Sequence, residues 1–139
     1  MPLCLDASAA IAAILPRPER SRVKQIILDA LSRGERLVAP PLLYAETTSV
    51  LRRHVHIGAI QHQEAVDALR GLLAMPIFVV DGPKVYLRAL ELARRLGQPR
   101  AYDVQYLAVA QLEGCTVLTL DRGLGHGAQT LGIDARLLR

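Results

Sequence analysis

The sequence predicts an α/β domain with a mainly parallel central sheet of about five strands flanked by helices. Short apolar runs of strand length alternate with longer segments whose apolar residues recur at helical spacing. One or two helical segments separate each apolar run from the next, and such long crossovers connect parallel strands. With 139 residues and 51% hydrophobic content the chain can bury a core, and we expect residues 1–139 to form a single domain.

The first half of the chain is predicted to contain two strands and four helices. The strands lie at 3–5 and 36–39, and the helices at 7–15, 19–33, 40–54 and 61–74. Prolines at 16 and 18 end the first helix, and Gly34 is a suitable stop for the second. Pro40 and Pro41 open the third helix, because proline is tolerated at the first helical position, and Pro76 closes the fourth.

The second half is predicted to add three strands. Residues 77–80 form a continuous apolar run, which is typical of a strand buried on both faces. An amphipathic helix at 85–96 ends at Gly97, a further helix runs from Asp103 to Gly114, and an apolar strand then leads to Asp121. Glycines 123, 125 and 127 are expected to form a flexible turn instead of a phosphate-binding loop, and the last strand is expected at 135–138.

The chain carries an excess of basic residues, with a net charge of +4. All but Lys24 and Lys84 of its 17 basic residues are arginine, whose planar fork suits phosphate, so a polyanionic partner is favoured. Candidate phosphate-binding residues are Arg17, Arg20, Arg22 and Lys24 near Asp6, and Arg94, Arg95 and Arg100 near Asp103. The first group could instead be a solvated helix face, and the second could pair with an acidic protein segment.

Cys4 and Cys115 lie in short apolar stretches, so we expect buried, reduced thiols and neither a disulfide nor a metal site. No apolar run approaches the ~18 residues that a membrane span needs. The N-terminus lacks the basic region of a signal peptide. We therefore expect a cytoplasmic protein without a membrane partner.

Four acidic residues are predicted to meet at the carboxyl edge of the sheet, where open α/β folds bind ligands. Asp6 and Asp121 directly follow apolar strands, Asp103 begins a helix, and Glu46 lies beside the apolar face of another helix. Each aspartate could instead be a helix cap. Asp81 also ends an apolar strand, and its spacing does not separate it from Asp121. Because no inward lysine or arginine matches the four acids, a divalent cation such as Mg²⁺ or Mn²⁺ would relieve their repulsion.

Several of these segments resemble the motifs of PIN domains, and more narrowly those of VapC-type toxins of toxin–antitoxin pairs. The segments are LDAS at 5–8, Glu46 in the helix after the second strand, YDVQYLA at 102–108 and LTLDRGL at 118–124. The resemblance covers nearly the whole chain. The YDxxYLA and TLDxxL motifs at this separation are the specific part of it.

Membership of that family implies a PIN-like three-layer fold and a metal-dependent endoribonuclease. Asp6, Glu46, Asp103 and Asp121 would then be the catalytic residues that hold Mg²⁺ or Mn²⁺, and Ser8 and Thr119 would support them by hydrogen bonding. The resemblance also implies an RNA substrate, a cognate antitoxin and a homodimer. It places Asp81 on an edge strand, outside the site, as a cap before the helix from Pro83.

One departure from the family pattern concerns the number of metal ions. Relatives often carry another acid or Asn shortly after the last motif Asp, whereas this chain has Arg122, Gly123, Leu124 and Gly125. One ion is therefore better supported than two. The alternative function is a PIN-like scaffold that binds RNA or protein without catalysis, and the complete set of acids counts against it.

Overall fold

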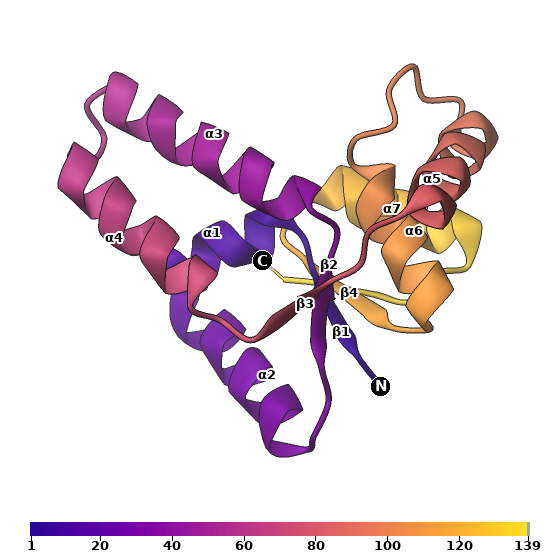
Figure 1. The fold of residues 1–139 in the computed structure, drawn as a ribbon, viewed down its shortest axis with the longest axis horizontal. Coiled ribbons are helices and arrows are strands. Elements are labelled where there is room, and N and C mark those ends of the chain that lie inside the picture. The colour runs from indigo at the N-terminus through magenta and orange to yellow at the C-terminus, as the bar shows by residue number, and fades with distance from the viewer. Residues whose placement is uncertain (139) are drawn as a thin grey trace.

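Five short strands form the centre of the molecule, and all of them run parallel (Figure 1). The computed structural model describes residues 1–138. The strands are β1 (Leu3–Leu5), β2 (Leu37–Ala39), β3 (Ile77–Val79), β4 (Thr116–Thr119) and β5 (Ala135–Leu137). The helices are α1 (Ala7–Ile14), α2 (Arg20–Ser32), α3 (Leu42–His56), α4 (His62–Leu73), α5 (Pro83–Leu96), α6 (Val104–Glu113) and α7 (Arg122–Leu131).

The strand order is β3-β2-β1-β4-β5, which confirms the predicted fold class. The chain moves outward from β1 to β3 and then returns to place β4 on the other side of β1. The direction of winding therefore reverses between β1 and β4. In open parallel sheets, a crevice for ligands forms at this reversal, beyond the carboxyl ends of the two strands.

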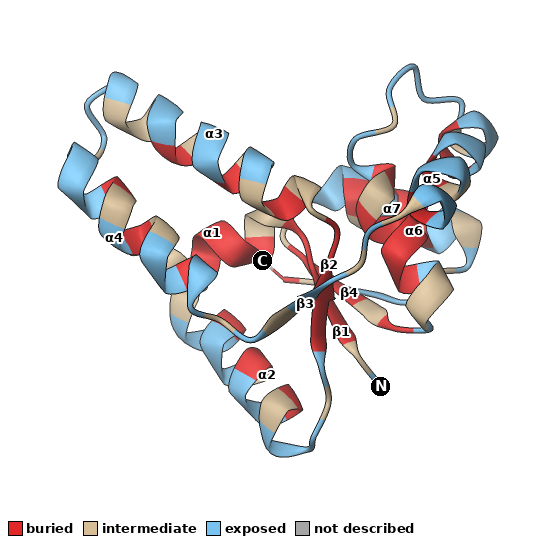
Figure 2. Ribbon diagram, viewed as in Figure 1, coloured by how far each residue is buried: buried red, intermediate tan, exposed pale blue. Residues whose placement is uncertain are grey.

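Helices cover both faces of the sheet (Figure 1). Leu3 and Leu5 of β1 pack on the side of α1 and α2, whereas Cys4 packs on the side of α6, because successive side chains of a strand point to opposite faces. Figure 2 shows that the central strands and the inward sides of α1 and α6 are buried. This packing fixes β1 and β4 rigidly and so positions the residues that follow them.

Two predictions about individual elements were wrong. The run at 77–80 is not buried on both faces, because β3 is an edge strand whose Phe78 and Val79 are 52% and 40% exposed. The glycine-rich segment is not a flexible turn but the helix α7. Asp121 caps this helix, and Gly127 lets it lie close to α5, since a Cβ there would be 3.2 Å from a methyl carbon of Leu96.

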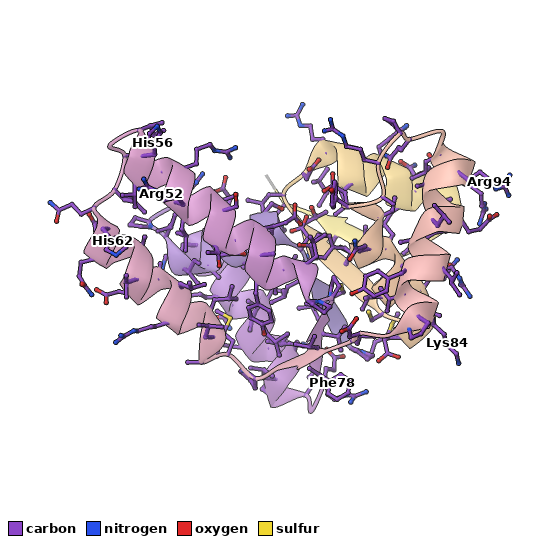
Figure 3. The ribbon with its side chains drawn as sticks, turned by 45° about the horizontal axis from the view of Figure 1, so that its top comes forward. Arg52, His56, His62, Phe78, Lys84 and Arg94 are labelled. Carbon is purple, nitrogen blue, oxygen red and sulfur yellow. The ribbon has the colours of Figure 1, made fainter. Side chains whose placement is uncertain are left out.

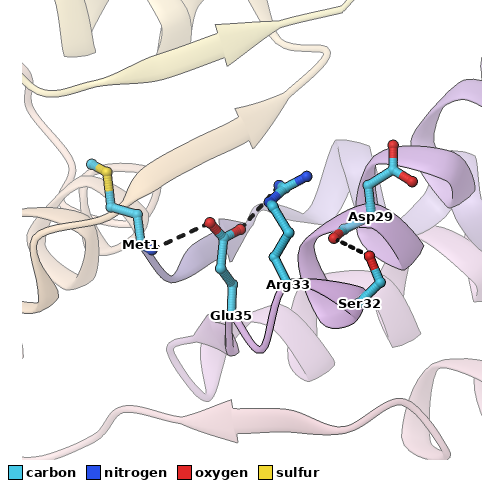
Figure 4. Close-up of polar contacts among 5 residues, drawn as sticks. All are labelled: Met1, Asp29, Ser32, Arg33 and Glu35. Atoms are coloured by element: carbon cyan, nitrogen blue, oxygen red, sulfur yellow. Dashed lines mark hydrogen bonds and ion pairs between the residues drawn. The ribbon is translucent and has the colours of Figure 1, made fainter.

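The amino-terminal edge of the sheet is held by polar contacts near the start of β1 and β2 (Figure 4). The N-terminal amine of Met1 and the guanidinium of Arg33 both pair with Glu35, at 3.3 and 3.1 Å. Ser32 donates a hydrogen bond to the carbonyl of Asp29 at the end of α2. These contacts lie at the opposite end of β1 from Asp6, so they steady the sheet and take no part in the acidic edge.

The expected burial of the cysteines is confirmed, because Cys4 and Cys115 are both buried, and both are free thiols. Among residues 1–138, no helix is both long enough and apolar enough to cross a membrane.

Candidate active site

Asp6 is a buried carboxylate at the point where β1 ends and α1 begins. Only 3% of the residue is exposed. Its Oδ1 accepts hydrogen bonds from the backbone N–H of Ala9 at 2.9 Å and from the Ser8 hydroxyl at 2.7 Å. Its Oδ2 accepts one from the Thr119 hydroxyl. Asp6 therefore is a helix cap, as one interpretation of the sequence held, but it is also tied to the neighbouring strand.

Ser8 and Thr119 connect Asp6 to the backbone at the end of β4. The Ser8 hydroxyl accepts from the N–H of Leu120 at 2.8 Å, and the Thr119 hydroxyl accepts from the N–H of Asp121 at 2.9 Å. Each hydroxyl has a single proton to give and directs it to Asp6. The hydrogen bonding expected for these two residues is thus present, and it holds the ends of β1 and β4 together across the crevice.

The Asp6 carboxyl is poorly suited to carry a charge in this position. Burial raises its pKa from 3.8 to about 6, although the hydrogen bonds from Thr119, Ala9 and Ser8 work in the opposite direction. The negative charge of Asp121 raises the pKa further. A buried carboxylate that is repelled by a second one is costly for a fold, and this cost points to a function.

Asp121 occupies the equivalent place at the end of β4. Its Oδ1 accepts from the N–H groups of Gly123 at 2.8 Å and Leu124 at 3.2 Å, so it caps α7. The other carboxylate oxygen accepts no hydrogen bond from residues 1–138. The residue is exposed, so this oxygen is available to a ligand above the sheet edge.

Glu46 reaches the same edge from α3 and is held there by a tyrosine. The Tyr106 hydroxyl donates to its Oε1 at 2.6 Å, although the two residues are separated by 60 positions. Partial burial raises the pKa of Glu46, the Tyr106 hydrogen bond lowers it, and the charges of Asp103 and Asp121 raise it again. Tyr106, which is 1% exposed, is a site residue that the sequence reasoning missed. Its spacing of three from Asp103 on one helix could have indicated it.

Asp103 stands at the start of α6, on the exposed side of the edge. Asp103 holds the N-cap position of α6, as one interpretation of the sequence held, but its side chain makes no capping hydrogen bond. Partial desolvation by the surrounding protein raises the pKa of Asp103, and the negative charge of Asp121 raises it further. Asp121 thus raises the pKa of Asp6, Glu46 and Asp103 alike, so the four acids share one electrostatic environment.

No cation of the protein balances this charge. None of the ion pairs within residues 1–138 includes Asp6, Glu46, Asp103 or Asp121. As they lie, however, no three Asp, Glu, His or Cys side chains in the described chain are grouped tightly enough to hold a metal ion. Asp6, Glu46 and Asp121 each direct an oxygen to a protein donor. The edge has the oxygen donors that Mg²⁺ prefers, without a closed set of ligands.

Asp81 lies outside this group, on the edge strand side as the resemblance implied. It is not the residue that caps α5, because Gly82 holds the N-cap position. The Asp81 carboxylate instead accepts from the N–H of Gly82 at 2.7 Å and from the Tyr86 hydroxyl at 2.8 Å. The hydrogen bonds of the Asp81 carboxylate therefore stay within residues 81–86.

Three cavities lie at or near the acidic edge, and the smallest, of about 110 Å³, is lined by Asp103 and Asp121 among others. A cavity of about 320 Å³ is lined by Ser8, Arg17, Arg53 and His54 among others, from α1, α3 and the turn after α1. A larger one of about 520 Å³ is lined by Glu46, Gln98, Pro99, Arg100, Tyr102 and Asp103. The expected phosphate-binding groups are therefore divided. Arg100 lines the cavity that contains Glu46 and Asp103, Arg17 lines the one that contains Ser8, and Arg20 and Lys24 line a separate cavity that contains neither Ser8 nor any of the four acids.

Comparison with known proteins identifies the family of the chain. The family model for the PIN domain matches residues 3–128. Ribonuclease VapC9 of Mycobacterium tuberculosis is 32% identical over 130 residues, which cover 91% of each chain. Ribonuclease VapC3 of Pyrobaculum aerophilum is 30% identical over 128 residues, covering 91% of this chain and 94% of the relative.

A solved structure shows the same fold. The crystal structure of VapBC2 from Rickettsia felis, bound to a DNA fragment from their promoter, aligns over 100% of both chains with a TM-score of 0.74 and 14% identity. The family model and the two relatives each span most of the sequence. The chain therefore belongs to the PIN domain family, and within it to the VapC proteins.

Proposed function

We propose that this protein is a metal-dependent endoribonuclease and the toxin of a toxin–antitoxin pair. The observation that carries the proposal is the Asp6 carboxylate, buried at the reversal point of the sheet and repelled by Asp121, with no protein cation beside it. The VapC relatives are named ribonucleases, which supports RNA as the substrate.

The acids fit a hard divalent cation by their chemistry. Asp6, Glu46, Asp103 and Asp121 would hold Mg²⁺ or Mn²⁺, which when bound supplies an activated water and neutralises charge on the phosphate. Ser8 and Thr119 keep Asp6 oriented, and Tyr106 does the same for Glu46. In the reaction, the oxygen of water forms a bond to phosphorus while one bridging P–O bond breaks, which leaves a phosphate end and a hydroxyl end.

Basic residues beside the acids would hold the phosphates that flank the cleaved bond. Arg17 and Arg53 line the cavity that also contains Ser8, and neither forms an ion pair within residues 1–138. Arg17 instead donates to Nε2 of His54 at 3.1 Å, and Nδ1 of His54 faces the carbonyl of Val50 at 2.8 Å. The ring is therefore a neutral acceptor for Arg17 and leaves the charge of the guanidinium for a phosphate.

Cleavage of total RNA by the purified protein, with Mn²⁺ or with EDTA, tests the activity. We expect cleavage only with the ion, and none from Asp103→Asn. Calorimetric titration with Mn²⁺ is the second measurement, and Glu46→Gln should lose most of the binding heat. Wild-type protein that binds no Mn²⁺ and cuts no RNA would favour the non-catalytic scaffold.

Neighbouring arginines of α3 allow a matched test of the phosphate contact. Arg53 lines the cavity next to Ser8, whereas Arg52, labelled on α3 in Figure 3, does not. Arg53→Gln should weaken RNA binding and reduce its salt dependence, because fewer counterions are released. Arg52→Gln should change binding less. Equal effects of both variants would show that general charge, and no particular contact, attracts the RNA.

A cognate antitoxin and a second copy of the chain complete the proposal. The likeness to VapBC2 supports the antitoxin partner. For the second copy, α5 offers Leu87 and Leu90, which are 68% and 67% exposed on one helix. Leu87→Lys with Leu90→Lys should convert a dimer to a monomer in light scattering, whereas Leu28→Lys on α2 should not. A dimer that survives the double change would have its interface on another surface.

A further inference from the structure

The largest of the three cavities at the acidic edge has the character of a binding site for a nucleobase. It lies between α3 and the segment from Gln98 to Asp103 that connects α5 to α6. Its volume is about 520 Å³, and two of its lining residues, Glu46 and Asp103, belong to the proposed catalytic group. Whatever occupies it lies directly beside the atoms that would react.

Three side chains of this cavity are free to bind a ligand. Tyr102 is 60% exposed, and neither its hydroxyl nor the side chains of Gln98 and Arg100 form a hydrogen bond or ion pair within residues 1–138. An exposed aromatic ring, a carboxamide and a guanidinium are the groups with which proteins bind unpaired RNA bases. The ring stacks on the face of the base, and the other two reach its polar edge.

The connecting segment is ordered by its own backbone, which favours a formed site. Gly97 ends α5 in the left-handed region with φ of 65°, and the N–H of Gln98 donates to the carbonyl of Ala93 at 2.9 Å. At the other end, the N–H of Gln105 donates to the carbonyl of Tyr102 at 3.0 Å, and its side chain donates to the carbonyl of Ala101 at 3.3 Å. Tyr102 is thus held at a fixed place in the turn before α6.

The charges of the cavity distinguish a base from a phosphate or an acidic peptide. Glu46 and Asp103 belong to its lining, and in the metal-free protein both would repel an anionic group. Arg100 is the single basic residue of the lining. A neutral, flat, polar-edged ligand avoids this repulsion and still uses all three free side chains.

From this combination we propose that the cavity binds one nucleobase of the RNA next to the cleaved phosphodiester. The base stacks on Tyr102, and Gln98 and Arg100 read its edge. The inference rests on the proposed ribonuclease function and adds to it a place where sequence preference arises. The cavity with Arg17 and Arg53 then holds backbone phosphates beside Ser8.

Binding of short, labelled single-stranded oligo(A), oligo(C) and oligo(U) RNA in EDTA, followed by fluorescence anisotropy, tests the stacking without cleavage. Tyr102→Leu should weaken binding of at least one of these RNAs by about tenfold, and Tyr102→Phe by no more than about twofold, because the aromatic face is retained. Tyr86→Leu is the matched control, since Tyr86 is 47% exposed on α5 and lines none of the three cavities at the acidic edge. It should bind like wild type.

Sequencing the fragments of total RNA cut in Mn²⁺ provides the second readout. Tyr102→Leu and Arg100→Gln should change the base preference at one position beside the cut, whereas loss of a merely structural residue would lower cleavage at all sites equally. Unchanged affinity and an unchanged cleavage pattern in Tyr102→Leu would overturn the base site while leaving the ribonuclease intact. The base site would also be overturned if Tyr102→Leu bound an acidic antitoxin peptide more weakly but bound RNA normally.

Failure of the proposed function has a different signature. A wild-type protein that binds RNA through Tyr102 but cuts none in Mn²⁺ would keep the base site and refute the catalytic assignment. A protein that neither binds nor cuts RNA would refute both.

Discussion

Replacing Asp6 with asparagine should stabilise the metal-free protein above pH 6 while abolishing RNA cleavage. The folded protein holds the Asp6 carboxylate at 3% exposure and beside the charge of Asp121. Asparagine keeps the shape of the side chain and removes its charge. A residue whose removal strengthens the fold but ends the activity is present for function.

The size of the effect follows from the pKa of Asp6. Burial raises it from 3.8 to about 6, which corresponds to about 3 kcal/mol at 1.36 kcal/mol per pKa unit. Because the pKa of Asp6 is higher in the folded state than in the unfolded state, the folded state holds the proton more tightly. This contribution to stability is complete below pH 3.8 and is lost as the pH rises through about 6.

Asparagine recovers only part of that energy. Its carbonyl can accept from Ser8 and the N–H of Ala9, but its NH₂ group faces the Thr119 hydroxyl, which donates to Asp6 in the native protein. Losing one such hydrogen bond costs about 1 kcal/mol. The net gain above pH 7 is therefore about 2 kcal/mol, or roughly 7 °C in Tm for a domain of this length.

Urea unfolding of both proteins in EDTA, at about pH 5 and about pH 8, measures this difference, because the shift in midpoint reports the change in stability. The variant should gain at the higher pH and be close to wild type at the lower one. Adding Mn²⁺ should then stabilise wild type and leave Asp6→Asn unchanged, because only a bound ligand shifts the equilibrium. A variant that is less stable than wild type at the higher pH, or a gap that does not depend on pH, would refute the reasoning.

Two further predictions concern the hydrogen bond that holds Glu46 and the packing around glycines of α4 and α7. Tyr106→Phe removes the hydrogen bond to Glu46, so the pKa of Glu46 should rise and the free energy of unfolding should fall by about 1 kcal/mol. The acid limb of the pH profile of RNA cleavage should therefore move to higher pH. An unshifted profile would exclude a positioning role for Tyr106. Gly71→Ala in α4 should stabilise the protein by about 0.5–1 kcal/mol in urea, because no atom lies within 4 Å of the added methyl group. Gly127→Ala should lose that gain to the contact with Leu96 at 3.2 Å, and equal gains would contradict the close packing of α7.

Prediction from the sequence succeeded where a local pattern decides the structure. The strands before Asp6 and Asp121 and the helix that carries Glu46 follow from apolar periodicity, and their alternation predicts a parallel sheet. In such a sheet the carboxyl ends of strands share one edge, so the meeting place of the acids was predictable as well.

Prediction failed where packing between distant segments decides. The glycines of α7 have low helix propensity, yet the cap from Asp121 and the close approach to Leu96 make the segment helical. The apolar run of β3 is that of a buried strand, but its place at the sheet edge exposes Phe78.

The sequence by itself determined the fold class, the order of the elements up to β4 and the acids at the edge of the sheet, because each is encoded in local periodicity and in chain order. The tertiary structure alone decided how those acids are held. Thr119 bonds to Asp6 across 113 positions and Tyr106 to Glu46 across 60, so each contact depends on how distant segments pack. It also placed Tyr102 beside the acids, because the neighbours of an exposed ring depend on which helices flank it.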